Sequence, residues 1–157
     1  MIIKGLLDED YVNYKKASMF IIFPHCTFKC EKDCGIKCCQ NSDVAKMPSL
    51  EVDPASLVER YIENPITHSI VFGGLEPLDS WKDLVNLVKL FRDHTDDDIV
   101  IYTGYTEDEV PLQIQHLQKF TNIIVKFGRF VPDAQHRFDD VLGVELASDN
   151  QYAKRIS

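Results

Sequence analysis

Short apolar runs alternate with longer stretches of helical spacing along most of the chain. Four of the runs are almost continuously apolar, which is typical of strands buried on both faces. They are residues 19–23, 69–72, 98–102 and 123–127. Between them, apolar residues recur every three or four positions, as they do in helices packed on a sheet. The predicted helices cover residues 53–62, 80–91 and, more weakly, 107–120, and a further short strand is expected within 141–146.

The repeated order of strand then helix predicts a parallel sheet with helical crossovers. A complete eight-fold barrel takes about 250 residues, so 157 residues suffice only for an incomplete barrel or an open sheet. The fold class expected is α/β, an incomplete (β/α) barrel of about five to six mainly parallel strands. We expect one domain over residues 1–157, because the chain has no internal repeat and no low-complexity linker.

Charge and hydropathy exclude some functions. The chain has 17 Lys and Arg residues against 25 Asp and Glu residues, a formal net charge of −8. This balance argues against a nucleic-acid partner, which would need basic surfaces. The first ten residues do not form a secretory signal, and no segment approaches the ~20 apolar residues of a membrane span. A cytoplasmic protein is expected, in which cysteines stay reduced.

All five cysteines lie within a single loop, residues 24–41. The loop also carries several charged residues, among them Lys29, Glu31 and Asp33, which do not line an apolar core. Two kinds of metal centre remain open. Structural zinc would take ligands from Cys26, Cys30, Cys34, Cys38 and His25, although the usual pairing of zinc ligands is missing. An iron–sulfur cluster held by thiolates from one compact loop fits the spacing better.

Several segments resemble a known family. They are Cys26-Thr27-Phe28-Lys29-Cys30, Cys39-Gln40-Asn41, Gly73-Gly74-Leu75-Glu76-Pro77-Leu78, Tyr102-Thr103-Gly104-Tyr105, Val125-Lys126-Phe127-Gly128-Arg129-Phe130 and Ser148-Asp149-Asn150-Gln151. A cysteine loop after one strand and a Gly-Gly-x-Glu-Pro segment after the next resemble the radical S-adenosylmethionine (SAM) superfamily. The closer resemblance is to the small activating proteins of anaerobic, class III ribonucleotide reductase.

The resemblance implies a [4Fe-4S] cluster held by three cysteines. Cys26 and Cys30 match the first two ligands, but Asp33 stands where the family has its third cysteine. The third ligand is then either Cys34 or, with an insertion in the loop, Cys39. We favour Cys39 because Gln40-Asn41 after it matches the family; Cys38 is a further alternative.

The resemblance also implies a site for SAM. Its expected residues are Cys38, Gln40, Gly73, Gly74, Glu76, Pro77 and Thr103. Cys38 and Gln40 would lie near the adenine, and the segment that begins with Gly73-Gly74 would receive the methionine amino group. Thr103 would contact the ribose or the carboxylate. A plain strand-to-helix turn remains the structural alternative for the two glycines.

The implied activity is the reductive cleavage of SAM to generate a glycyl radical. The partner would be the large catalytic subunit of anaerobic ribonucleoside-triphosphate reductase, with a reduced flavodoxin- or ferredoxin-type protein as electron donor. The alternatives are activation of another glycyl radical enzyme and a non-catalytic iron–sulfur or zinc-binding module. The enzyme would consume SAM, whereas the non-catalytic module would not react with it.

Overall fold

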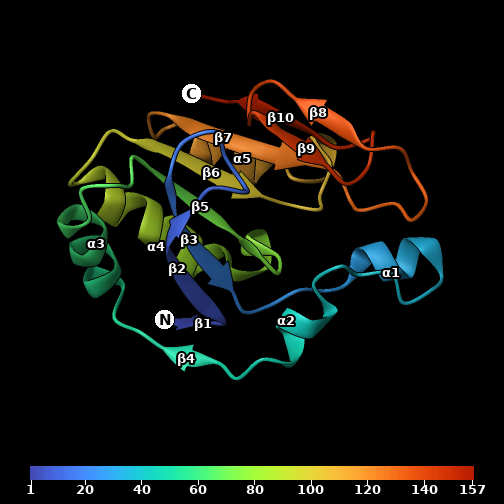
Figure 1. The fold of residues 1–157 in the computed structure, drawn as a ribbon, viewed down its shortest axis with the longest axis horizontal. Coiled ribbons are helices and arrows are strands. Elements are labelled where there is room, and N and C mark those ends of the chain that lie inside the picture. Colours follow the sequence, from blue (N-terminus) through green and yellow to red (C-terminus); the bar gives the residue numbers. More distant parts are fainter.

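A six-stranded sheet with the strand order β10-β7-β6-β5-β3-β2 forms the centre of the computed structural model, which describes residues 1–157 (Figure 1). Its strands are β2 (Gly5–Asp10), β3 (Ser18–Phe23), β5 (Ser69–Gly74), β6 (Asp98–Tyr102), β7 (Ile123–Phe127) and β10 (Tyr152–Arg155). Two small ladders pair β1 (Ile2–Ile3) with β4 (Leu50–Glu51) and β8 (Arg137–Asp139) with β9 (Val144–Leu146). The helices are α1 (Lys29–Cys34), α2 (Ser42–Lys46), α3 (Pro54–Glu63), α4 (Trp81–Arg92) and α5 (Pro111–Leu117).

The four apolar runs identified in the sequence form β3, β5, β6 and β7, which are parallel and adjacent in chain order. Their buried side chains explain why they show no alternation of polar and apolar residues. In the register of the sheet, Phe23 lies opposite Gly74 and Tyr102 lies opposite Lys126. The carboxyl ends of these strands therefore meet at one edge of the sheet.

The predicted incomplete barrel of mainly parallel strands is wrong. The sheet is open and mixed, because β2 pairs with β3, and β10 with β7, in antiparallel orientation at its two edges. Both small ladders are antiparallel as well, so four of the seven strand pairings are antiparallel.

The connections explain this difference. Only seven residues separate β2 from β3, too few for the crossover that a parallel neighbour requires. The longer connection from β7 to β10 contains the β8–β9 ladder instead of a helix. The edge strands escaped prediction because Gly-Leu-Leu-Asp-Glu-Asp and Tyr-Ala-Lys-Arg are too polar and too exposed to resemble buried strands.

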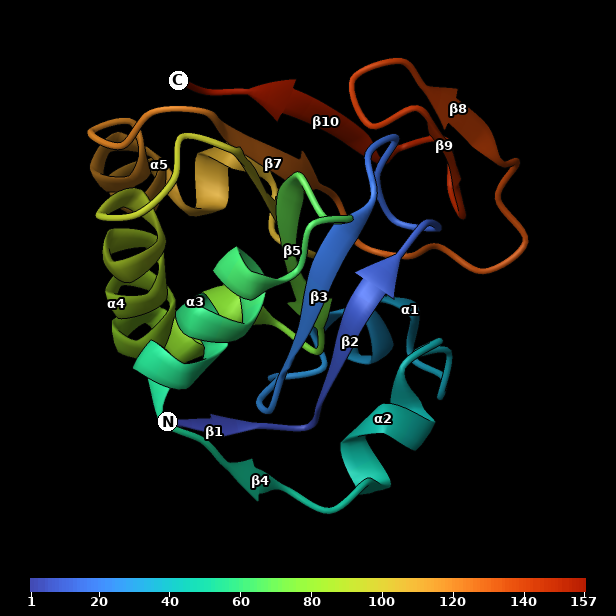
Figure 2. The same cartoon turned by 60° about the vertical axis from the view of Figure 1, so that its left-hand side comes forward.

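Two apolar cores lie on opposite faces of the sheet. The larger one packs α3, α4 and α5 against one face, through residues such as Leu57, Phe91 and Leu117. In Figure 2 these three helices lie on the same side of the sheet. The smaller core contains Tyr14 and Leu146, from the β2–β3 connection and from β9. No helix combines the length and the hydropathy that a bilayer crossing requires.

The predicted helix starts agree with the structure in part. Asp53 caps α3 by accepting a hydrogen bond of 3.2 Å from the Ala55 N–H, and Pro54 takes the first helical position, as expected. The weak helix predicted over 107–120 is divided into a 3₁₀ turn (Glu107–Glu109) and α5, which begins at Pro111. The strand expected within 141–146 is limited to β9, outside the main sheet.

Asp98, the first residue of β6, is a buried charge with several partners. Its carboxylate accepts hydrogen bonds from Tyr14 Oη (2.9 Å), Lys16 Nζ (2.6 Å) and Arg155 Nη2 (2.7 Å). Burial alone would raise the pKa of Asp98, but these donors hold it at about 2. The carboxylate thus joins the β2–β3 connection and β10 to the middle of the sheet.

We expect Asp98→Asn to lower the free energy of unfolding by about 2 kcal/mol at neutral pH. The native pKa lies below that of an unfolded Asp, so the stabilisation is complete above about pH 4 and is lost as the pH falls toward 2. Urea unfolding at a series of pH values measures this. Between pH 4 and pH 2 the variant should lose less stability than the wild type; equal losses would contradict the assignment.

Gly74, the last residue of β5, has a φ of 83°, a left-handed conformation that favours glycine. A Cβ atom at this position would overlap Ile22 Cγ2 on β3. Gly35 provides a control, because its φ is 71° but a Cβ there would meet nothing within 4 Å. Comparison of the two glycines separates backbone strain from steric overlap.

Gly35→Ala should cost about 1 kcal/mol of stability, from backbone strain alone. Gly74→Ala should cost roughly 1–3 kcal/mol more, because Ile22 must move. Chemical denaturation of both variants gives the two values. Equal costs would show that β5 does not depend on this close packing.

Candidate metal centre

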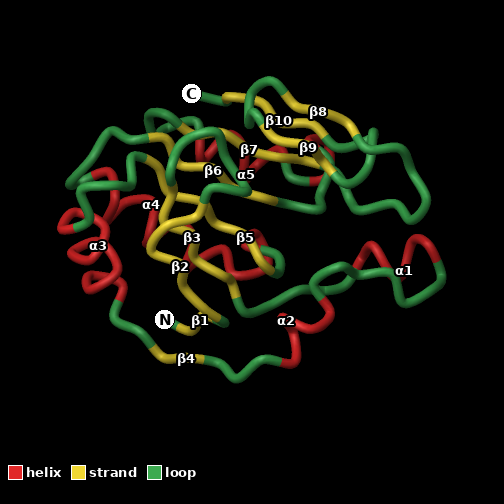
Figure 3. The backbone as a smooth tube through the Cα atoms, viewed as in Figure 1, coloured by secondary structure: helices red, strands yellow, loops and turns green.

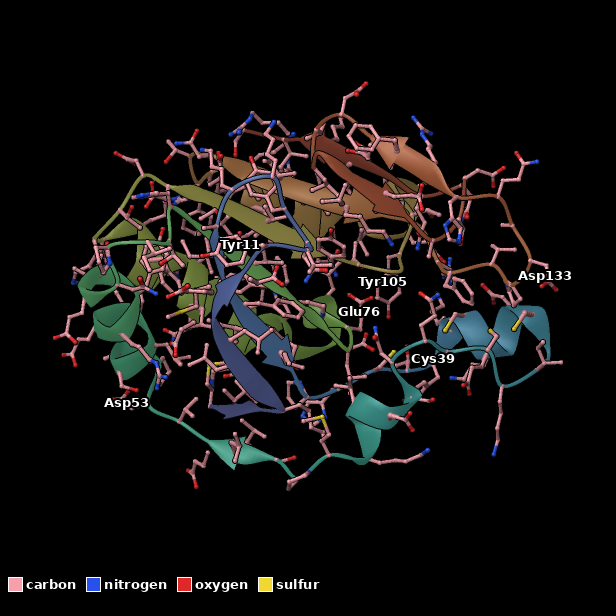
Figure 4. The ribbon with its side chains drawn as sticks, viewed as in Figure 1. Tyr11, Cys39, Asp53, Glu76, Tyr105 and Asp133 are labelled. Carbon is pink, nitrogen blue, oxygen red and sulfur yellow. The ribbon has the colours of Figure 1, made fainter.

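The carboxyl ends of β3, β5, β6 and β7 surround a cavity of about 410 Å³. Twenty-eight residues line it, half of them hydrophobic. Its walls include Cys39 from the cysteine segment (residues 24–41), Glu76 after β5 and Tyr105 after β6. Figure 4 shows these three labelled residues on the side of the molecule that carries α1. The segments that follow the four parallel strands therefore share one edge of the sheet.

The cysteine segment leaves the end of β3 and runs mostly as loop; the short helix α1 interrupts it, and α2 follows it (Figure 3). Hydrogen bonds to the end of β5 fix both of its ends. The Glu76 N–H donates to the His25 carbonyl at 2.8 Å, and Asn41 Nδ2 donates to the Gly74 carbonyl at 2.6 Å. The Thr27 N–H donates to Asp79 Oδ2 at 2.7 Å.

The five thiols fall into two sets. Cys26, Cys30 and Cys39 line the cavity. Burial raises the pKa of Cys26 to about 11, and burial followed by the contact with Cys39 raises the pKa of Cys30. Cys34 and Cys38 do not line the cavity, and their sulfur atoms lie 2.6 Å apart.

An ion-pair network holds α1 against the edge of the sheet. Lys29 Nζ and Arg129 Nη2 contact Glu109 Oε1 at 3.0 Å and 2.6 Å, and Arg129 Nε lies 2.9 Å from Asp33 Oδ2. The hydrogen bond from Arg129 is the largest cause of the lowered pKa of Glu109. The network joins α1, which carries Cys30, to the segments that follow β6 and β7.

Glu76 is a buried carboxyl in the cavity wall. Its two oxygens accept hydrogen bonds from the Gly104 N–H at 2.8 Å and the Leu78 N–H at 3.1 Å. Burial raises the pKa of Glu76 to about 7, although these donors and Thr103 act in the opposite direction. The side chain joins the end of β5 to the end of β6.

The other expected ligand-binding residues divide into two groups. Gln40, Gly74, Glu76 and Thr103 line the cavity. Cys38, Gly73 and Pro77 do not. Gly73 lies within β5, where a Cβ would be 2.9 Å from the ring of Phe20, and Pro77 is buried at the start of a 3₁₀ turn.

Lys126 is a cavity residue that the sequence analysis did not select. Only 7% of it is exposed, and its Nζ donates to the Gly128 carbonyl at 2.8 Å. Burial lowers the pKa of Lys126 to about 8. The available signal was a single charged residue in the otherwise apolar strand Ile-Ile-Val-Lys-Phe. Gln151, from the segment before β10, also lines the cavity and donates to the same carbonyl at 3.2 Å.

As they stand, no three Cys, His, Asp or Glu side chains are placed to hold a single metal ion. A cubane cluster makes a different demand, because each thiolate binds a different iron atom at a separate corner. Cys26, Cys30 and Cys39, from three points of one segment and facing one cavity, fit that demand.

Comparison with known proteins identifies the family. A family model described as a 4Fe-4S single cluster domain matches residues 16–151, which include the four parallel strands, the whole cysteine segment and most of the residues that line the cavity. No curated protein and no solved structure matches the chain. Because the match covers most of the chain, this protein belongs to the family of 4Fe-4S single cluster domains.

Proposed function

We propose that the chain is a radical SAM activating enzyme whose cluster is held by Cys26, Cys30 and Cys39. The observation that carries the proposal is that these three thiols share one cavity with a buried carboxyl and a buried amine. The two remaining thiols lie outside that cavity. Three protein ligands leave one iron of a [4Fe-4S] cluster free for a substrate.

The buried residues Glu76 and Lys126 support a ligand that carries an ammonium and a carboxylate group, as SAM does. Glu76 and Lys126 line the same cavity without forming a close ion pair, and burial shifts the pKa of each toward the neutral form. Perturbed groups of this kind in a cavity are typical of binding sites. In the proposed complex, Lys126 faces the carboxylate of SAM, and Glu76 faces its ammonium group beside Gly74.

The remaining walls provide shape and exclude water. Phe20, Ile22 and Tyr102 from the sheet and Leu146 from β9 line the cavity. Apolar walls suit a reaction that must be protected from solvent and from unwanted hydrogen donors. Gln40 and Thr103 supply polar groups for the adenine and the ribose. When bound, the cluster supplies the electron that cleaves SAM.

The proposed partner is the large catalytic subunit of anaerobic ribonucleoside-triphosphate reductase, on which the reaction generates a glycyl radical. A reduced flavodoxin- or ferredoxin-type protein is the proposed electron donor. The identity of the partner rests on the Tyr-Thr-Gly-Tyr and Ser-Asp-Asn-Gln segments. Both lie beside the cavity, through Tyr102, Thr103 and Gln151.

The ligand assignment predicts which cysteines are needed for the cluster. Cys26→Ala, Cys30→Ala and Cys39→Ala should each lose most bound iron and acid-labile sulfide after anaerobic reconstitution, because each removes one of three ligands. Cys38→Ala, next to Cys39, is the matched control and should load like the wild type. A full cluster in Cys39→Ala, or its loss in Cys38→Ala, would reverse the assignment.

The activity predicts that reconstituted protein with a strong reductant forms 5′-deoxyadenosine from SAM, which mass spectrometry detects.

Lys126→Met should weaken SAM binding roughly ten- to a hundredfold, because a buried charged hydrogen bond contributes about 1.5–3 kcal/mol. Lys119→Met, at an exposed position, should bind SAM as the wild type does. Equal binding by both variants would exclude the proposed role of Lys126.

Addition of the reductase subunit tests the partner. Product that forms only with this subunit supports the proposed pair, as does a glycyl radical detected on it by electron paramagnetic resonance. Product without any radical on this subunit would indicate another glycyl radical enzyme. Absence of product from fully loaded protein, with and without the subunit, would indicate a non-catalytic iron–sulfur module.

A further inference from the structure

Cys34 and Cys38 form a pair that the proposed cluster does not use. Their sulfur atoms are 2.6 Å apart, well within van der Waals contact, and neither residue lines the cavity. Both are free thiols in the structure. A function for this pair therefore adds to the proposed function, and it rests on Cys39 being the third cluster ligand.

The local backbone brings the two thiols together. Cys34 is the last residue of α1, and Gly35, with φ at 71°, reverses the chain directly after it. The thiol of Cys34 lies 3.3 Å from the Ile36 carbonyl, and that of Cys38 lies 3.6 Å from the Cys30 carbonyl. Three residues separate the pair, so the turn holds the sulfurs together without any long-range contact.

The turn between the two cysteines is exposed, and Cys34 and Cys38 themselves are half-buried. Ile36 is 60% exposed, and Gly35 and Lys37 are exposed as well. The proposed ligands line the cavity together with Lys29 and Arg129, which both pair with Glu109. The pair therefore lies beside an exposed turn and outside the cavity that the proposed ligands line.

We propose that Cys34 and Cys38 form a reversible dithiol–disulfide site that reacts with small-molecule disulfides such as oxidised glutathione. One cysteine, as the thiolate, attacks the small disulfide, forms a mixed disulfide and releases one small thiol. The second cysteine then attacks the mixed disulfide, forms the Cys34–Cys38 bond and releases the second small thiol. The protein loses two electrons and two protons, and the oxidant is reduced to two thiols.

The position of the Cys34–Cys38 pair between two proposed ligands indicates a protective role. The pair lies in the chain between Cys30 and Cys39, and it consumes oxidant at the surface of the segment that supplies the ligands. Oxidation at this site leaves Cys26, Cys30 and Cys39 as thiols that can still bind the cluster. Reduction by a dithiol restores the starting state without loss of any ligand.

The test is anaerobic treatment of the full chain with oxidised glutathione, before and after reconstitution, followed by alkylation of free thiols and tryptic digestion. Trypsin separates the cysteines well, since Cys30 falls in 30–32, Cys34 in 33–37, and Cys38 and Cys39 in 38–46. Mass spectrometry should first detect peptide 33–37 linked to 38–46 through Cys38. Cys26, Cys30 and Cys39 should remain alkylated at that stage, and a dithiol should reverse the link.

Variants separate the possible outcomes. Cys38→Ala should accumulate glutathione on Cys34, because the second thiol is gone. The double variant Cys34→Ala/Cys38→Ala should load iron like the wild type; loss of iron would overturn the ligand assignment and this proposal together. Normal iron loading with no 34–38 disulfide in the wild type would overturn this proposal alone. An earlier disulfide among Cys26, Cys30 and Cys39 would do the same.

Discussion

The close packing of β5 against β3 is the constraint on which the candidate site depends. A Cβ at Gly73 would meet the ring of Phe20, and a Cβ at Gly74 would overlap Ile22. Without these side chains the two strands stay paired to their ends, where Phe23 faces Gly74. The cysteine segment and Glu76 consequently start from adjacent points, and the Glu76 N–H continues the pairing by donating to the His25 carbonyl.

Buried charges at the two ends of the sheet differ in how they are satisfied. At the amino end of β6, Asp98 accepts hydrogen bonds from three donors, and its charged form is stabilised. At the carboxyl ends, Glu76 and Lys126 face a cavity, and burial shifts the pKa of each toward neutrality. Burial of an incompletely paired charge costs stability. The hydrogen bonds to Asp98 stabilise the fold, whereas Glu76 and Lys126 suit a ligand that carries charged groups of its own.

The fold divides the five thiols into two sets, three that line the cavity and two that lie outside it. The chain reverses at Gly35, so that Cys34 and Cys38 meet outside the cavity while Cys39 lines it. The ion pairs of Lys29, Asp33, Glu109 and Arg129 hold α1 in the position that this division requires. The same short segment therefore holds both the last proposed ligand and the separate Cys34–Cys38 pair.

The sequence by itself determined the four central strands, the α3 cap at Asp53 and the iron–sulfur family, because apolar runs, capping residues and clustered thiols are local signals. Only the tertiary structure decided the rest. The antiparallel edge strands depend on chain reversals that leave no apolar pattern in the sequence. The cavity position of Lys126 depends on the direction in which its side chain leaves β7. Likewise, five thiols within fourteen residues are equivalent by composition. They differ only once the fold turns three toward the cavity and leaves two in contact outside it.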